Sequence, residues 1–383
     1  MTEKLYDADS HMFEFTARVV SCEKKGRGYA VILDRTAFFP EGGGQPSDQG
    51  YLDGAAVYDV QISDDIEHFT DRPFDAGAEV QGVVDRSRRL DFMQQHSAEH
   101  IVSGIVHECF GFENVGFHLS GETVTLDFDG MLSNEQIAGI ELEANRRVRR
   151  NVKFKTWYPS ESELKTLVYR SKKEIEGAVR IVEIEDTDRC ACCAPHVSEA
   201  AEIGAIYLEN AGKMRGGSRL VLKAGERAVK AHRAAADALH SIGALVSAKP
   251  GSEETSVERL ISALEEEKRK VSSADKRLLE LKAESVPDSA AAVFTDLSGD
   301  ALFRLAELLF ARSGSLKAVF SPINGGFQFA VRGNEKELAG TFERLRNAFP
   351  VRGGGRDGLR RGSIEADRAA LEKFFGYKNG ENI

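Results

Sequence analysis

Two short motifs that carry potential metal ligands constrain the fold of this chain more than any other feature. His96 and His100 stand four residues apart in an apolar segment of helical period, so both imidazoles should lie on one face of a helix. Cys192 and His196 show the same spacing in a proline-containing loop about ninety residues later. Three nitrogen donors and one sulfur donor suit zinc. We therefore predict one Zn²⁺ per chain, bound by His96, His100, Cys192 and His196.

A second interpretation of the first motif stays open. His96, Glu99 and His100 also fit the H-x-x-E-H pattern of certain zinc peptidases, in which Glu99 would be the general base. That interpretation lacks a clear third ligand, and it leaves Cys192 and His196 without a role. We therefore expect Glu99 to lie beside the metal site or at the surface.

The five cysteines do not form a disulfide pattern. Cys190, Cys192 and Cys193 crowd together, while Cys22 and Cys109 stand alone. This distribution favours a reducing compartment, which we take to be the cytoplasm, and a metal role for the cluster. Cys190 or Cys193 could replace Cys192 as the ligand, although only Cys192 stands four residues before His196.

A glycine-rich segment, Thr36–Gly50, is the third candidate element. Gly42, Gly43 and Gly44 expose backbone N–H groups next to the amide of Gln45, and such a loop can approach a ligand closely. The alternative is an ordinary barrel turn, which glycine and proline also form.

The fold class that we predict is α+β. The first part alternates short β-rich runs with glycine and aspartate turns, which is typical of a small antiparallel β-barrel. A helix over 87–109 and another from Ser133 to Arg150 follow, and the strands 179–184, 203–209 and 218–222 should share one sheet. The predicted domains are a barrel (1–86), a zinc-containing α+β domain (87–224), a helical spacer (225–286) and a small α/β domain (287–383).

The helical spacer has a break at Lys249–Ser252 and a heptad pattern after it. Val257, Leu264, Val271 and Leu278 occupy its a positions. An antiparallel helical hairpin and a dimer seam both fit this pattern.

The charge balance and the hydropathy pattern narrow the function classes. A net charge of -10 argues against general coating of nucleic acid, so RNA contacts would need local basic patches such as Arg352–Arg361. The apolar runs are too short and too interrupted by charge to cross a bilayer, and the N-terminus lacks the apolar core of a signal peptide. We expect no membrane association.

Together these motifs resemble the AlaX-type alanyl-tRNA editing proteins, which are similar to the editing region of alanyl-tRNA synthetase. The resemblance rests on three motifs in order: the loop Thr36–Gly50, Gln95–His100 and Cys192–His196. It extends to a DHHA1-type C-terminal domain with a glycine-rich loop, Gly353–Gly358. Arg356 and Asp357 depart from the family pattern there, which usually has small or proline residues.

This resemblance implies hydrolysis of the ester in mischarged Ser-tRNA(Ala), with Gly-tRNA(Ala) as a second candidate substrate. It implies catalytic roles for Thr36, Gln45, His96 and His100, with Thr36 or Gln45 contacting the serine hydroxyl, and mischarged tRNA(Ala) as the partner. A homodimer could form through the helical spacer or the C-terminal domain. The alternatives are a non-catalytic, zinc-stapled tRNA-binding protein and the zinc peptidase. The substrate-binding residues that we predict are Gly42, Gly43, Gly44, Arg352, Gly353, Gly354, Gly355 and Arg356.

Overall fold

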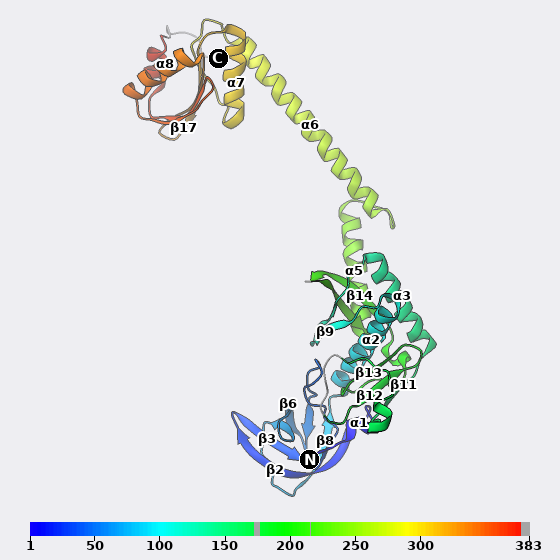
Figure 1. Ribbon diagram of the computed structural model, residues 1–383. Helices are drawn as coiled ribbons and strands as arrows, with labels where there is room; N and C mark the ends of the chain where they lie inside the picture. The colour runs from blue at the N-terminus through cyan, green and yellow to red at the C-terminus, as the bar shows by residue number, and fades with distance from the viewer. Residues whose placement is uncertain (172–176, 215, 377–383) are drawn as a thin grey trace. The chain divides into compact units, whose positions relative to one another are not determined.

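The computed structural model describes residues 1–171, 177–214 and 216–376. The protein has a mixed α+β structure, as predicted, and it divides into two compact units, Met1–Ser241 and Ile242–Ile383 (Figure 1). The finer division into four domains stays a prediction. No helix within the described residues combines the length and the apolar character that a bilayer span requires.

Six antiparallel strands of the first unit close into a barrel, which confirms the predicted N-terminal architecture. Alternate side chains point into the barrel, and the residues of β8 alternate strictly between exposed and buried. A short parallel pair, β1 (Glu3–Lys4) with β4 (Arg35–Thr36), lies beside α1 (Leu5–Ala8). In barrel order the strands are β2 (Glu14–Lys25), β3 (Gly28–Leu33), β7 (Ile66–Thr70), β6 (Ala55–Ile62), β5 (Gly50–Leu52) and β8 (Glu79–Val84).

His68 is a completely buried histidine of the barrel, and its protonation should limit stability in acid. Burial lowers the pKa of His68 from 6.5 to about 4, although a hydrogen bond to the Val31 carbonyl opposes the shift. The unfolded chain therefore binds this proton near pH 6.5 and the folded barrel only near pH 4. The His68 contribution to stability is present above pH 6.5, and it is lost as the pH falls through this window.

We expect the loss to reach about 3 kcal/mol below pH 4. His68→Asn should therefore flatten the decline in the free energy of unfolding between pH 6.5 and pH 4. Urea unfolding, followed by the fluorescence of Trp157, the single tryptophan, measures this decline. Other histidines titrate alike in both proteins, so parallel pH profiles for the two would contradict the assignment.

The remainder of the first unit is built around the helix α2 (Arg86–Phe110). The Asp85 side chain caps its N-terminus by accepting a hydrogen bond from the Arg88 backbone, and Gly111 ends it with a positive φ. The predicted helix α3 (Asn134–Arg150) begins with a capping box formed by Ser133 and Gln136. Both helices pack on a sheet of β14 (Ile206–Met214), β15 (Gly217–Ala224), β10 (Val124–Phe128) and β9 (Asn114–Leu119).

The strands of this region do not share one sheet, and that expectation was wrong. β12 (Ile181–Ile184) pairs with β11 (Phe154–Trp157) and β13 (Asp188–Ala191) in a separate three-stranded sheet. β13 follows β12 after a short turn and supplies a local antiparallel partner, whereas β11 pairs with the other edge of β12 although it is as remote in sequence as β14. The short helices α4 (Glu161–Leu164) and η1 (Ala200–Ile203) complete the unit.

Helices α5 (Gly225–Leu245) and α6 (Glu253–Ser285) form where the sequence predicts them, separated by the predicted break. The heptad residues Leu264, Val271 and Leu278 of α6 are exposed. The choice between a hairpin and a dimer seam stays a prediction.

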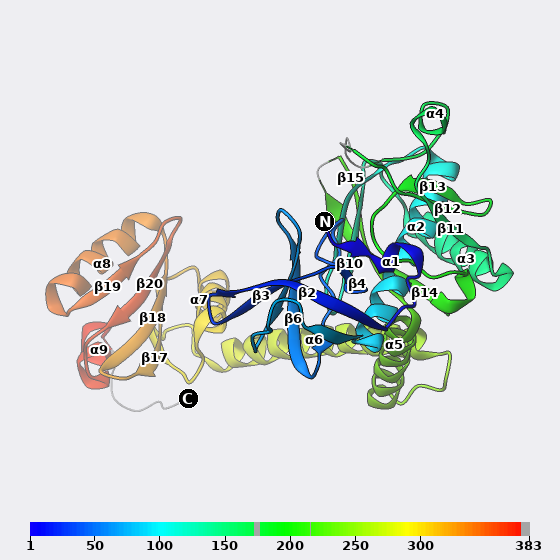
Figure 2. The same ribbon diagram turned by 90° about the horizontal axis from the view of Figure 1, so that it is seen from below.

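The C-terminal part of the second unit is a sheet with helices on both faces (Figure 2). Helix α7 (Gly299–Ser313) packs on one face, and α8 (Glu335–Ala348) and α9 (Arg368–Phe374) pack on the other. The strand order is β16 (Ala292–Phe294), β17 (Lys317–Ile323), β18 (Gly326–Arg332), β20 (Leu359–Ile364) and β19 (Val351–Gly354).

Candidate functional site

Helix α2 and the loop after β13 bring four potential metal ligands together. His96 and His100 stack one turn apart on α2, with ring centroids 5.3 Å apart, and the His196 ring lies within 5 Å of both. Each of the three histidines is nearly inaccessible to solvent, and Cys192 is half-buried. One donor atom from each of His96, His100, Cys192 and His196 lies within 4.8 Å of the others. This cluster could hold a metal ion.

In each of the three histidines, the Nδ1 atom has a partner that could fix the orientation of the ring. Nε2 of His96 and Nε2 of His196 lie 3.6 Å and 3.4 Å from the Cys192 Sγ. Each Nδ1 has a different partner: Gln45 Oε1 at 2.9 Å for His96 and Ser97 Oγ at 3.1 Å for His196. The His100 Nδ1 lies 2.8 Å from the Cys190 Sγ. Since Nδ1–H donates outward, Nε2 is free to face a metal.

The charge state of the cluster suits metal binding. Burial opposes ionisation of the Cys192 thiol, but His96 and His196 lower its pKa well below 9.0. Burial lowers the pKa of His196 to about 3, which keeps its imidazole neutral at pH 7. Burial also acts to lower the pKa of His100, but Cys190 and Glu99 raise it well above 6.5. Metal binding at His100 would therefore displace a proton.

Asp188 and Arg170 position His100 from the Nδ1 side of its ring, and no spacing pattern in the sequence marks either residue. The Asp188 carboxylate lies 3.6 Å from the His100 Nδ1 and accepts two hydrogen bonds from Arg170, at 2.8 Å and 2.7 Å. Burial alone would raise the pKa of Asp188, but hydrogen bonds from His100 and Arg170 lower it. A carboxylate behind a ligand histidine orients the ring and raises its basicity.

We expect Asp188→Asn to weaken metal affinity by about 10- to 100-fold, because it removes the charge behind His100. Competition with a chromogenic chelator measures this affinity. Asp186→Asn is the matched control, since Asp186 is an exposed turn residue with a positive φ that asparagine also tolerates. A change of less than about threefold in Asp188→Asn, or equal losses in both variants, would refute the role of Asp188.

Arg180 fixes the loop that carries Cys192 and His196. Its side chain is buried, and Nη1 donates to the carbonyls of Cys192 and Ala194 at 3.1 Å and 2.9 Å. Asp7 lies 3.4 Å from the Arg180 Nε and balances its charge. Nothing in the spacing of the sequence marks Arg180, because its role depends on carbonyl groups that only the folded loop presents.

The triglycine turn lies against this cluster. Gly42 and Gln45 exchange two backbone hydrogen bonds, and Gly43 and Gly44 have positive φ values. A side chain at Gly44 would collide with Phe117, which explains the need for glycine there. Gln45 is buried, and within the described residues its Nε2 has no hydrogen-bond partner. With Oε1 held by His96, this amide N–H group is available to a ligand.

Thr36 lies in β4, where its hydroxyl is already engaged. The His68 Nδ1 lies 3.0 Å from the Val31 carbonyl and must donate to it, so the His68 Nε2 accepts from Thr36 Oγ1 at 2.7 Å. The Phe38 N–H donates to the same Thr36 oxygen at 3.1 Å. Thr36 can therefore offer a ligand only a remaining lone pair.

The residues that form the open alternatives have structural partners. Glu99 is buried, and its Oε1 accepts hydrogen bonds from Ser103 and Asn114, both at 2.7 Å. Cys190 contacts His100, as described above, and Cys193 is exposed next to Gly43. Cys193 belongs to no group of clustered donors within the described residues, whereas Cys190 stands outside the group of four but forms a second group with His100 and Asp188 that could also hold a metal ion.

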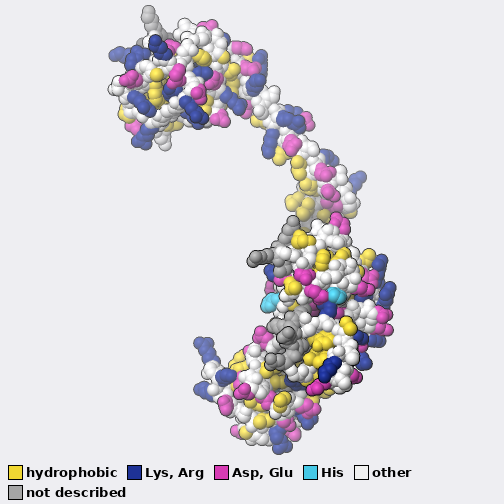
Figure 3. Space-filling view, in the orientation of Figure 1, with side chains coloured by type: hydrophobic (Ala, Val, Ile, Leu, Met, Phe, Trp, Pro, Cys, Tyr) yellow, Lys and Arg dark blue, Asp and Glu magenta, His cyan; other side chains and the backbone are white. Residues whose placement is uncertain are grey.

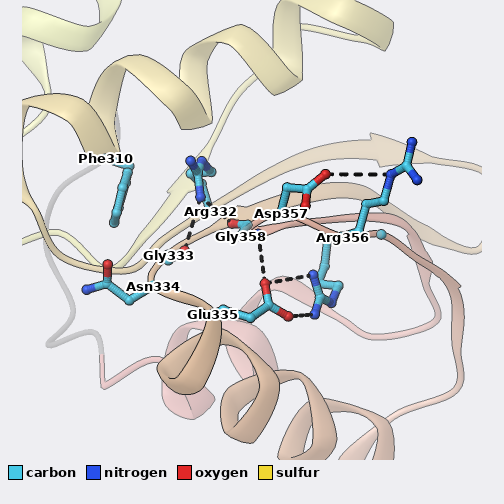
Figure 4. A pocket seen from close by; sticks show the side chains of 10 residues that line it. Phe310, Arg332, Gly333, Asn334, Glu335, Arg356, Asp357 and Gly358 are labelled. Carbon is cyan, nitrogen blue, oxygen red and sulfur yellow. Dashed lines mark hydrogen bonds and ion pairs between the residues drawn. The ribbon is translucent and has the colours of Figure 1, made fainter.

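The predicted RNA-binding residues belong to the second unit, at the turn between β19 and β20. Arg352 and Arg356 expose 85% and 92% of their side chains, whereas Arg360 exposes only 13% and pairs with Glu335. Glu335 also accepts the backbone N–H of Gly358 at 2.7 Å (Figure 4). The arginines of this loop are thus unequal: Arg360 is mostly buried against Glu335, whereas Arg352 and Arg356 are exposed and make looser ion pairs with Glu365 at 3.8 Å and Asp357 at 3.6 Å.

Comparison with known proteins relates two segments of this chain, one in the barrel and one that carries part of the His/Cys cluster, to families of tRNA synthetases. Residues 7–88 match the family described as tRNA synthetases class II (A). Residues 179–221, which include Cys192 and His196, match the threonyl and alanyl tRNA synthetase second additional domain.

The names of individual relatives refer to alanyl-tRNA editing or to alanine–tRNA ligation. The chain is 32% identical over 241 residues to the alanyl-tRNA editing protein Aarsd1 of Bos taurus, which covers 58% of this chain and 54% of the relative. It is 31% identical over 312 residues to the alanine–tRNA ligase of Ignicoccus hospitalis, covering 77% of this chain and 34% of the ligase. The chain thus spans little more than half of the bovine relative. It is related to alanyl-tRNA editing proteins and to alanyl-tRNA synthetases, as the sequence motifs predict.

Proposed function

We propose that this protein is an aminoacyl-tRNA deacylase that removes serine, and as a second candidate glycine, from mischarged tRNA(Ala). The observation that carries the proposal is the His/Cys cluster next to the Gln45 Nε2, which has no partner among the described residues, within segments related to alanyl-tRNA editing proteins. The partner that follows is mischarged tRNA(Ala).

We further propose that the ion is zinc, held by His96, His100, Cys192 and His196. Three imidazole nitrogens and a thiolate are the donors that tetrahedral zinc sites use, and each histidine has an orienting partner on its Nδ1. When bound, the ion would supply a Lewis acid next to the ester. Four protein ligands favour a positioning role for it.

The protein's own groups supply recognition. The Gln45 N–H group can donate to the hydroxyl of a serine ester or to the ester carbonyl. The Thr36 lone pair can accept from a serine hydroxyl, since the Thr36 proton is committed to His68. A buried group satisfied only by a hydroxyl disfavours alanine esters, which leave it unpaired.

The deciding experiment compares hydrolysis of Ser-tRNA(Ala), Ser-tRNA(Ser) and a peptide by the full chain. We expect hydrolysis of Ser-tRNA(Ala) alone. Binding of tRNA(Ala) without hydrolysis would favour the zinc-stapled binding protein, and peptide cleavage would favour the peptidase. The hydrogen bonds of Glu99 to Ser103 and Asn114 disfavour a peptidase base at that position.

For the tRNA body, we propose contacts with the exposed arginines of the β19–β20 turn. Figure 3 shows Lys and Arg side chains across the visible face of the C-terminal unit, mixed with Asp and Glu. We expect Arg352→Ala to lower the slope of log affinity against log salt by about 0.9, the value for one lost phosphate contact.

Arg360→Ala should change this slope little, because Glu335 already neutralises Arg360. Filter binding of tRNA(Ala) over a range of salt concentrations measures both slopes. Equal slope changes in the two variants would show that the pairing with Glu335 does not matter for RNA binding.

A further inference from the structure

A cavity of about 590 Å³ lies on the sheet of the second unit, next to α7. Helix α7 packs over β17 and β18, where Leu302 and Leu305 contact a core that includes Ala330. Successive side chains of a strand point to opposite faces, so Gln328, two residues from Ala330, lies on the α7 side of β18. The register pairs Gln328 with Ser363 and Ser363 with Arg352. These three side chains therefore form a row across β18, β20 and β19 on the α7 side.

This row has unused capacity for hydrogen bonding. Directly opposed residues in an antiparallel sheet place their Cβ atoms about 5 Å apart, so the three polar groups are evenly spaced. Gln328 and Ser363 line the cavity and are half-buried, and among the described residues neither side chain has a hydrogen-bond partner. An amide and a hydroxyl can each donate and accept. A flat ligand with donors and acceptors along one edge fits this row.

Phe303 and Arg361 form a stacking wall at the same cavity. The Phe303 ring comes from α7 and is half-buried, and the guanidinium carbon of Arg361 lies 5.1 Å from its centroid. Aromatic rings and guanidinium planes are the surfaces on which proteins stack unpaired bases. Arg352 is exposed at the rim, 3.8 Å from Glu365, where it could meet a phosphate.

We propose that this cavity binds one unstacked nucleobase of an RNA chain, an inference that rests on the proposed function in taking tRNA as the RNA. The base stacks against Phe303 and Arg361, its edge hydrogen-bonds with Gln328 and Ser363, and its phosphate contacts Arg352. A bare phosphate would leave the aromatic wall and the uncharged side chains of Gln328 and Ser363 without a role. A base with its phosphate uses all of these groups.

The test measures binding of the full chain to two labelled single-stranded oligoribonucleotides of equal length, one with bases and one abasic. We expect the native protein to bind the oligonucleotide with bases more tightly by about fivefold or more, as one stacked base provides. Phe303→Leu keeps an apolar side chain in the core but removes the stacking surface, and it should abolish this preference. Gln328→Leu should reduce the preference without touching the α7 packing.

Phe310→Leu is the matched control, because Phe310 is an aromatic residue of the same helix that lines a different pocket. It should keep the preference for bases. Equal binding of both oligonucleotides by the native protein, or a preference that survives in both Phe303→Leu and Gln328→Leu, would overturn the proposal. Hydrolysis of a serylated acceptor-stem minihelix by the native protein tests the deacylase separately. If the native protein prefers the oligonucleotide with bases but does not hydrolyse the minihelix, the deacylase proposal fails and the base-binding proposal stands.

Discussion

Cys192→Ser is expected to empty the metal centre and to reduce the rate of Ser-tRNA(Ala) deacylation strongly. Loss of a residue that only orients a ligand costs about 10- to 100-fold, and loss of the ligand itself should cost more. Cys192 provides the thiolate of the cluster, and both His96 and His196 face its sulfur. Serine at this position offers a hydroxyl, which does not ionise at pH 7 and binds zinc poorly. Metal content after gel filtration and initial rates of deacylation measure the two effects.

Cys193→Ser is the control for this experiment. Cys193 is adjacent in sequence and is exposed, but its sulfur is not one of the four clustered donors. We expect this variant to keep one metal ion per chain. If Cys193→Ser lost the metal and Cys192→Ser kept it, the ligand assignment would be wrong, and the open alternative for Cys193 would replace it.

Arg89→Met should destabilise the first unit by about 3 to 5 kcal/mol, the usual cost of breaking a buried ion pair from one side. The side chains of Arg89 and Asp48 are fully buried and pair through two hydrogen-bonding nitrogens of Arg89. Arg89 also donates to the carbonyls of Ser10 and Ala37, at 2.9 Å and 2.5 Å. The variant leaves the Asp48 carboxylate buried without its counter-charge.

Urea unfolding followed by Trp157 fluorescence measures this loss, because Trp157 belongs to the first unit. The double variant Arg89→Met with Asp48→Asn should recover part of the stability, since it removes both charges while the amide oxygen can still accept from Phe39 N–H. A single variant that loses less than about 1 kcal/mol, a surface-pair value, would contradict the buried pairing.

Much of the fold follows from local sequence patterns. The alternation of short strands and turns predicts the barrel, and the cap at Ser133 predicts the start of α3. The assignment of strands to sheets does not follow from such patterns. A strand such as β12 has the same apolar composition whichever partner it pairs with, and only the chain geometry around β11 and β13 decides.

In the candidate site, too, some residues follow from local sequence patterns and others do not. The spacing of His96 and His100 predicts a shared helix face, and the structure places both rings there. The orienting residues Ser97, Arg180 and Asp188 carry no such signal. Each is a common residue type, and its role depends on the distance to a ligand group that is remote in sequence and reached only after folding.

The position of Arg89 in the first turns of α2 has a mechanical consequence. The helix that anchors Asp48 and the Ala37 carbonyl through Arg89 is the one that presents His96 two turns later. The glycine turn and the imidazoles are therefore both attached to helix α2, so thermal motion of the barrel should move them together. The distance between the glycine turn and the histidine ligands should therefore stay nearly constant while the surrounding sheets fluctuate, and substrate selectivity that depends on this distance is preserved.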